Sequence, residues 1–373
     1  MGHKKRIWAF WAPMYHHTNR FKVGSKQKAI KSLICLCVIF CISLVILVAY
    51  RYTKDSDSCK DLDGRRRILI DRMCPANSKP CQNVYLGAMS LGEKKKVFLR
   101  LLVSDDRTEG AETAVVLRSP GGEQETSEKF RCTNIQKWPV DHDTIIVSHE
   151  AAILAATFLM SSLSLEETGK GKEILEIGLG GGNYDMRLHK MKPYANITAV
   201  EIDPIVVKMA YKWFGVVDSE FHHTVVQDGK VFLEQAYSQG RKFDIVVIDA
   251  CGSYSSPLLC PADPFQDAII LGKIKKMLTK SGTLIVDLLS TDYTEIGNYV
   301  WKKFLQILKS LFPVCVMMNI RDRDNIVVTC TTMSMSNISD LAIHFDNRLA
   351  TIISTFRLNY VLDVAYTTIL HAK

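Results

Sequence analysis

The chain has 373 residues, of which 47% are hydrophobic, and a formal net charge of +8. Its length accommodates one large domain or two modest ones, and its composition excludes a fibrous or wholly disordered chain. Residues 1–31 contain eight Lys or Arg and no acid, so the rest holds 39 basic and 39 acidic residues. Because this remainder is formally neutral, its charge does not indicate a nucleic-acid surface.

Nineteen uncharged residues, SLICLCVIFCISLVILVAY, follow the basic tail at 32–50. At helical rise they are long enough to cross a hydrocarbon core. A cleaved signal peptide is one alternative, but the upstream tail is long and LVAY is a poor cleavage site. A buried core helix is another, but the segment has no polar face. We expect a retained signal-anchor, a transmembrane helix that makes the chain a single-pass membrane protein with its basic tail in the cytosol.

Residues 51–66 are charged and turn-rich, which is typical of a stalk. Short β-rich runs follow, among them RILIDRM, VFLRLLV and TAVVLRS, and we predict a small β-rich subdomain over 67–143. Eight cysteines lie outside the apolar segment. This even number fits disulfides in an oxidising compartment and free thiols equally well. No cysteine pair has zinc spacing, so no metal site is predicted.

From about residue 144 the pattern alternates between strands and helices. Apolar strand runs begin at EILEIGL and end at GTLIVDLLS, with helical runs between them. This alternation predicts an α/β domain over 144–332 with a Rossmann-like, doubly wound parallel sheet. We predict a helical extension over residues 333–373. Its helix has the sequence SDLAIHFDNRLATIISTF, and Ser339 or Asp340 is placed to cap it.

The first strand of this domain ends in a glycine turn, GLGGG at 178–182. A dinucleotide-binding turn would require glycine at position 183, which is Asn183 here. The observed spacing is Glu176-x-Gly178-x-Gly180-x-Gly182, which resembles the first motif of class I methyltransferases. Those enzymes bind S-adenosylmethionine, whose cationic end an acid near the turn can meet.

Acids also end the next three strands. Glu201 and Asp203 end the second strand, where a carboxylate can accept the ribose hydroxyl protons. Asp228 and Gly229 end the third, and Asp249 ends the fourth. One acid at a strand end is most often a turn or helix cap, but four in succession favour a nucleoside-type cofactor site.

These stretches resemble the spermidine synthase-like branch of class I S-adenosylmethionine-dependent methyltransferases over roughly 144–332. AVEIDPIVVKMAYKWFG, QDGKVFL and FDIVVIDACG look like polyamine aminopropyltransferases. More closely, GLGGG, AVEIDP, KWFG, QDG and CPADPF, with LTKSGTLIVDLLS after them, look like the C-terminal domain of the elongation factor 1-alpha lysine and N-terminal methyltransferases.

The resemblance implies a role for each matching residue. Glu201 would hold the ribose, Asp228 and Gly229 would meet the adenine, and the glycine turn would line the methionine part. His149 and Glu150 would lie beside the substrate groove.

Two departures bear on the reaction. Aminopropyltransferases carry an acid in the glycine turn, where this chain has Gly181, and a D-S-S-D-P run where it has Asp249-Ala250-Cys251-Gly252-Ser253. A dicationic polyamine would lose several charge-assisted hydrogen bonds here, each worth roughly 1.5 to 3 kcal/mol.

We therefore expect a membrane-anchored methyltransferase that acts on an amine of a protein, with Asp249 orienting the amine or accepting its proton. A catalytically weakened binding module of the same fold is the main alternative, and an aminopropyltransferase is the less favoured one. A homodimer is left open.

Overall fold

The computed structural model describes residues 34, 36–47, 62, 67–76, 80–91, 95–106, 111–119, 135–252, 256–290, 292, 294–320, 325–335 and 340–372. The chain divides into two compact units, 1–58 and 59–373. In the first unit, residues 36–47 are helical and their large apolar side chains are exposed. Among the described residues, no helix combines the length and the apolar character needed to cross a membrane. The predicted span 32–50 extends at both ends beyond the described residues. Most of the predicted stalk also lies outside the described residues.

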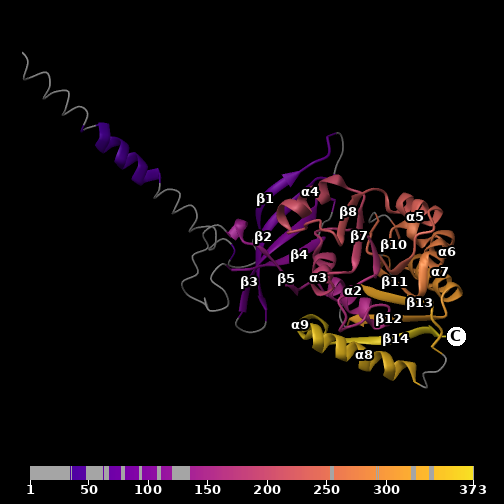
Figure 1. Ribbon diagram of the computed structural model, residues 1–373. Coiled ribbons are helices and arrows are strands. Elements are labelled where there is room, and N and C mark those ends of the chain that lie inside the picture. Colours follow the sequence, from indigo (N-terminus) through magenta and orange to yellow (C-terminus); the bar gives the residue numbers. More distant parts are fainter. Residues whose placement is uncertain are drawn as a thin grey trace, which may run out of the picture. The chain divides into compact units, whose positions relative to one another are not determined.

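The second unit begins with a five-stranded antiparallel sheet in the order β1-β2-β3-β4-β5 (Figure 1). Its inner face packs on helix α4 (Pro204–Trp213), where Val84, Leu102 and Val115 of the sheet meet Met209. The sheet is therefore held against the large domain by a shared apolar core. Its strands are β1 (Ile68–Met73), β2 (Gln82–Leu91), β3 (Lys95–Ser104), β4 (Thr113–Leu117) and β5 (Val140–Ile145).

The large sheet has the order β14-β12-β13-β11-β9-β6-β7-β8, with β10 paired to β11. Strands β6, β7, β8, β9 and β11 run parallel, as their long apolar runs predicted. Its strands are β6 (Glu173–Ile177), β7 (Asn196–Glu201), β8 (His222–Val226), β9 (Phe243–Ile248), β10 (Leu258–Cys260), β11 (Leu278–Ser290), β12 (Val314–Ile320), β13 (Ile326–Thr331) and β14 (Ala365–Ala372).

The predicted parallel sheet is confirmed for β6 to β9 and β11, but the strands after β11 make the sheet mixed. Strand β13 pairs antiparallel with β11, and β12 pairs antiparallel with both β13 and β14. The C-terminal segment therefore supplies an edge strand as well as a helix. A short loop joins β12 to β13, and only antiparallel strands can be joined so closely.

Helices cover both faces of the large sheet (Figure 1). One apolar cluster joins one face to α2, α3, α8 and α9, and another joins the opposite face to α5, α6 and α7. In α8 the Asp340 carboxylate accepts the Ile343 N–H at 3.1 Å, which is the predicted cap. The helices are α2 (Ser148–Leu159), α3 (Asn183–Met191), α5 (Gly229–Ser238), α6 (Ala268–Met277), α7 (Glu295–Leu311), α8 (Leu341–Phe356) and α9 (Asn359–Leu362).

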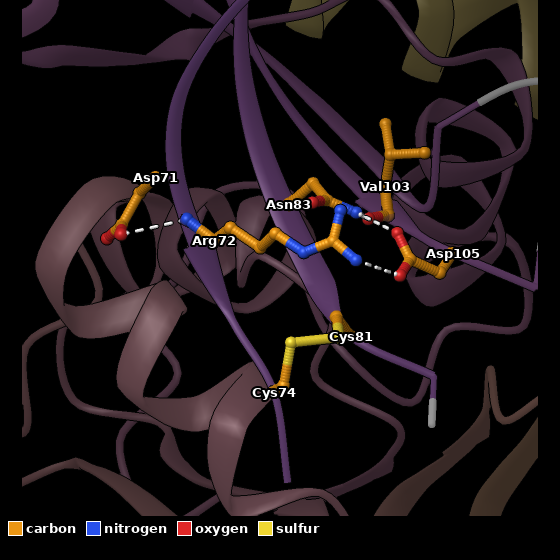
Figure 2. The surroundings of a disulfide bond; sticks show 7 residues. All are labelled: Asp71, Arg72, Cys74, Cys81, Asn83, Val103 and Asp105. Carbon is orange, nitrogen blue, oxygen red and sulfur yellow. Dashed lines mark hydrogen bonds and ion pairs between the residues drawn. A yellow bond between two sulfur atoms is a disulfide. The ribbon is translucent and has the colours of Figure 1, made fainter. Parts of the chain in front are cut away.

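Three disulfides lie in the described part of the second unit. Cys74–Cys81 closes the end of the β1–β2 pair, and Cys315–Cys330 joins directly opposite residues of β12 and β13. Cys251–Cys260 joins the loop after β9 to β10. Around Cys74–Cys81, Figure 2 shows Asp105 accepting hydrogen bonds from Arg72 and Asn83. Cysteines 59 and 132 lie outside the described residues.

Candidate functional site

The glycine turn after β6 has a backbone that demands glycine. Gly178, Gly180 and Gly182 have φ values of 99°, 53° and 71°, a region that side chains disfavour. At Gly178 an added Cβ would also lie 2.5 Å from the carbonyl oxygen of Asp249. The turn therefore brings the tips of β6 and β9 into direct backbone contact.

Gly181 faces the small antiparallel sheet. Its N–H donates to the Thr113 hydroxyl of β4 at 2.8 Å, and an added Cβ would lie 2.6 Å from Thr113 Cγ2 and 2.9 Å from Phe214 Cδ1. The position at which aminopropyltransferases carry an acid therefore has no room for a side chain in this protein.

Glu201, at the tip of β7, binds the glycine turn directly. Its Oε2 accepts the Leu179 N–H at 3.1 Å and the Gly180 N–H at 3.4 Å, while Oε1 accepts the Asp203 N–H at 2.9 Å. Burial raises the pKa of Glu201, and these three donors oppose the shift. Asp203 serves as the cap of α4, since its carboxylate accepts the Ile205 N–H at 2.7 Å.

Asp228 caps α5 in the same way, with Oδ1 accepting the N–H groups of Lys230 and Val231. At the neighbouring Gly229, an added Cβ would lie 2.5 Å from Ile177 Cγ2 of β6. Both residues therefore have a structural task at the carboxyl edge of the sheet. The capping bonds occupy only Oδ1 of Asp228, so Oδ2 remains for a ligand.

Glu150 and Glu176 are buried beneath the glycine turn. The Asn183 amide donates to Glu150 Oε2 at 2.6 Å, whereas Glu176 Oε2 has no hydrogen-bond partner among the described residues. Burial raises the pKa of Glu150 to about 8. Burial, with the nearby carboxyls of Asp185 and Asp249, raises the pKa of Glu176 well above its ordinary value.

Asp185, in the first turn of α3, is fully buried and pairs with a histidine. His222 Nε2 lies 2.6 Å from Asp185 Oδ2. Burial alone would disfavour the protonated ring, but the Asp185 carboxylate outweighs it and raises the pKa of His222. Asp185 Oδ1 remains without a partner among the described residues, as Glu176 Oε2 does. Two orphaned carboxylate oxygens beneath one turn suit a cationic ligand.

Asp249 lies partly buried at the tip of β9, where its N–H donates to the Ile177 carbonyl at 2.9 Å. A surface pocket opens beside the following loop, lined by Gly252, Ser256 and Asp263 among others. His149, in the first turn of α2, is partly exposed. The structure thus gathers the predicted carboxyls at one edge of the sheet, and the pocket is lined by residues that follow Asp249 in the chain, beginning at Gly252.

Several residues that the sequence analysis did not select belong to this edge. Asn183 and Asp185 open α3, and their polar side chains directly after a glycine turn were an available signal. Thr113 comes from a different sheet and carries no such signal. Ile202 directly follows β7 and Val226 ends β8, and these residues are 65% and 51% exposed. Such apolar surface at a polar edge suits the face of a flat ring.

Comparisons with known proteins agree with this architecture. Residues 155–338 match the family model of the spermine/spermidine synthase domain. A Drosophila pseudoobscura pseudoobscura protein named eEF1A lysine and N-terminal methyltransferase homolog is 28% identical over 192 residues, which are 51% of this chain and 28% of that protein. The polyamine aminopropyltransferase of Vibrio vulnificus is 32% identical over 122 residues, which are 33% of this chain and 39% of that protein.

Two solved structures share the fold. Human methyltransferase-like protein 13 in complex with SAH aligns with a TM-score of 0.51 and 24% identity, over 57% of this chain and 93% of that one. A probable spermidine synthase from Corynebacterium glutamicum aligns with a TM-score of 0.52 and 12% identity, over 83% and 96%. The chain spans well under half the length of the curated relatives named above. Residues 155–338 therefore resemble the spermine/spermidine synthase domain in sequence, and the solved structures show the same fold.

Proposed function

We propose that the domain is an S-adenosylmethionine-dependent methyltransferase that acts on an amine of a protein. The observation that carries this proposal is the buried carboxyl cluster beneath the glycine turn, in which Glu176 Oε2 and Asp185 Oδ1 have no partner among the described residues. A ligand that is cationic at one end and a nucleoside at the other satisfies this cluster and the exposed Ile202 and Val226 together. The names of the methyltransferase relatives support the same activity.

Each residue then has a defined task. Glu201 would accept hydrogen bonds from the ribose, and Asp228 Oδ2 would accept one from the adenine amino group. Glu176 would face the cationic end. When bound, the cofactor supplies a methyl group already activated on a sulfonium. Asp249 would orient the acceptor amine and hold the proton that it loses, while the neighbouring surface pocket leaves room for a protein segment.

Aminopropyl transfer is disfavoured by the packing at Gly181. Thr113 and Phe214 fill the space in which an acid would have to contact a polyamine. The same packing supports a second candidate, a binding module that retains the cofactor without catalysis, because the substrate side has changed more than the cofactor side.

Calorimetric titration of the full chain tests the cofactor assignment. We expect binding of S-adenosylmethionine in preference to its decarboxylated form, and we expect Glu201→Ala to weaken it by about tenfold or more, equivalent to about 1.4 kcal/mol. Glu173→Ala is the matched control, because Glu173 is a glutamate of the neighbouring strand β6 that lies at the opposite end of the strands, where it accepts hydrogen bonds from Asn196. If neither form binds, the proposal is wrong.

Methyl transfer is measured separately from cofactor binding, with methyl-labelled S-adenosylmethionine and a protein extract. Asp249→Asn should keep cofactor affinity and lose labelling. Binding without labelling of any protein would favour the non-catalytic module. Preference for the decarboxylated form would instead restore aminopropyl transfer.

We further propose that residues 32–50 anchor the protein in a membrane and that the folded domain lies on the non-cytosolic side. Two observations support this proposal, the nineteen uncharged residues and the three disulfides among the described residues of the second unit, since disulfides persist mainly in oxidising compartments. The homodimer stays a prediction.

A further inference from the structure

A disulfide and a buried acid lie together just beyond the tip of β9. The sulfur atoms of Cys251 and Cys260 and a carboxylate oxygen of Asp287 all lie within 4.8 Å of one another. Cys260 belongs to β10 and is opposite Leu289 of β11, the strand that carries Asp287. The pairing of β10 with β11 therefore brings the acid to the disulfide.

Asp287 is 1% exposed, and only one of its two carboxylate oxygens has a hydrogen-bond partner among the described residues. Its Oδ2 accepts the Asn325 amide at 2.8 Å, whereas Oδ1 has no hydrogen-bond partner among the described residues. Burial raises the pKa of Asp287 to about 7, although hydrogen bonds from Asn325 and the Leu288 backbone oppose the shift. The Asn325 amide and the closed Cys251–Cys260 disulfide, which lie next to it, carry no charge. Asp287 can therefore gain or lose a proton near neutrality.

The two cysteine residues differ in exposure. Cys251 is partly exposed, whereas Cys260 is 1% exposed. An incoming thiolate can therefore reach Cys251, and the leaving sulfur is the buried Cys260. A thiolate released in a buried site is costly unless it gains a proton, and the group placed to supply one is Asp287.

We propose that Cys251 and Cys260 form a thiol–disulfide exchange site for a protein dithiol, in which Asp287 gives its proton to the leaving Cys260 sulfur. A thiolate of the dithiol attacks Cys251 Sγ, the Cys251–Cys260 bond breaks, and its electron pair goes to Cys260, which takes the Asp287 proton. This attack leaves a mixed disulfide between Cys251 and the first sulfur of the dithiol. The second thiolate of the dithiol then attacks that first sulfur and releases Cys251, which takes a proton from solvent. The dithiol is oxidised to a disulfide and the cysteine pair is reduced by two electrons.

Exchange at this site acts on the loop beside the surface pocket. The Gly252 N–H donates to the Leu259 carbonyl at 2.7 Å and the Ala262 N–H to the Ala250 carbonyl at 2.8 Å, so the disulfide fastens a loop that begins two residues after Asp249. An effect of reduction on methyl transfer rests on the proposed function. The exchange chemistry itself does not.

The chain contains two matched control disulfides. Cys74–Cys81 also joins an exposed to a buried cysteine, but both oxygens of the nearby Asp105 are already bound, by Arg72 and Asn83 (Figure 2). Cys315–Cys330 is buried at both ends. Neither control combines an accessible sulfur with an acid that has a free oxygen.

The test treats the full chain with limiting dithiothreitol, quenches with N-ethylmaleimide and measures labelled cysteines by peptide mass spectrometry. Cys251–Cys260 should open before Cys74–Cys81 and Cys315–Cys330. Asp287→Asn should slow its opening about tenfold at about pH 6, where Asp287 carries its proton, and little at about pH 8, where it does not. The opening rate of Cys74–Cys81 should not change.

A second variant separates proton donation from altered folding. Asn325→Ala removes a hydrogen bond that holds the Asp287 pKa down, so the donor form should persist to higher pH and Cys251–Cys260 should open faster than in the unaltered chain at about pH 8. Equal opening rates for Asp287→Asn and the unaltered chain at both pH values would overturn the proposal. The proposal would also be overturned if Asp287→Asn slowed the opening of Cys74–Cys81 as much as that of Cys251–Cys260.

Discussion

At position 181, a residue from another sheet determines which side chain can be accommodated. Thr113 both accepts the Gly181 N–H and places a methyl group where a Cβ would lie. The packing around position 181 therefore leaves no room for an acidic side chain.

At this position we predict that Gly181→Ala destabilises the fold by about 1 to 3 kcal/mol, because a methyl group 2.6 Å from Thr113 Cγ2 overpacks the contact. Thr113→Ser removes that methyl and keeps the hydroxyl, so the same substitution should cost less in the Thr113→Ser background. Urea unfolding of all four chains measures the coupling. An equal cost in both backgrounds would show that Thr113 does not set this position.

Glu150 gives a residue-scale prediction for pH. Its pKa of about 8 in the folded protein exceeds the ordinary value of 4.5, so the folded state holds a proton that the unfolded state has lost between these values. Its contribution to stability therefore falls as pH rises from about 4.5 to about 8.

Glu150→Gln should thus stabilise the protein at about pH 8 by on the order of a few kcal/mol and change little at about pH 5. The Gln oxygen can still accept the Asn183 amide. The free energy of unfolding across this pH range checks the prediction. The exposed Glu234→Gln, whose carboxylate pairs with Lys273, serves as the control and should show no such slope. A stabilisation by Glu150→Gln that does not vary with pH would contradict the assigned cause.

At the scale of elements, Arg100 joins the small sheet to the large domain. This buried side chain of β3 donates to the carbonyls of Trp213, Gln136 and Trp138 and lies over the Trp213 ring. Burial lowers its pKa to about 10, so it stays charged at neutral pH. It therefore connects β3, the segment before β5 and the end of α4.

We predict that Arg100→Met destabilises the protein by about 2 to 4 kcal/mol, because the variant leaves buried carbonyls without donors. Arg118→Met is the matched control, since Arg118 is 54% exposed and pairs with Asp141 on the surface, and it should cost about 1 kcal/mol or less. Urea unfolding of both variants gives the comparison. Similar losses would mean that Arg100 is not the main connection.

At the scale of the whole molecule, the proposed topology predicts which side of the membrane the domain occupies. Translation into microsomes should give a product whose domain resists added protease. It should also carry a glycan at the Asn337-Ile-Ser sequon, and Asn337→Gln should remove it. Asn196, the other sequon, donates its amide to Glu173 and should stay unmodified. A protease-sensitive, unglycosylated domain would place it in the cytosol.

The α/β fold followed from the sequence because its signals are local. Apolar runs alternate with helical periodicity from about residue 144, and this pattern predicted β6 to β9 and the helices between them. The glycine turn and the acids at successive strand ends predicted one carboxyl edge, since parallel strands all end on the same side. The Asp340 cap was predicted for the same reason, because a cap and its helix are neighbours in sequence.

The remaining features depended on contacts between distant segments. An apolar run does not indicate whether its strand is parallel or antiparallel to its neighbours. Only the pairing of β12, β13 and β14 in the structure therefore showed an antiparallel edge. Thr113 reaches Gly181 only because the small sheet packs on α4 and the glycine turn. Asp287 reaches Cys260 only because β10 pairs with β11. The sequence by itself determined the fold class and the edge at which the acids gather, whereas the tertiary structure decided which residues pack on Gly181 and which acid lies beside the disulfide, because those contacts join strands far apart along the chain.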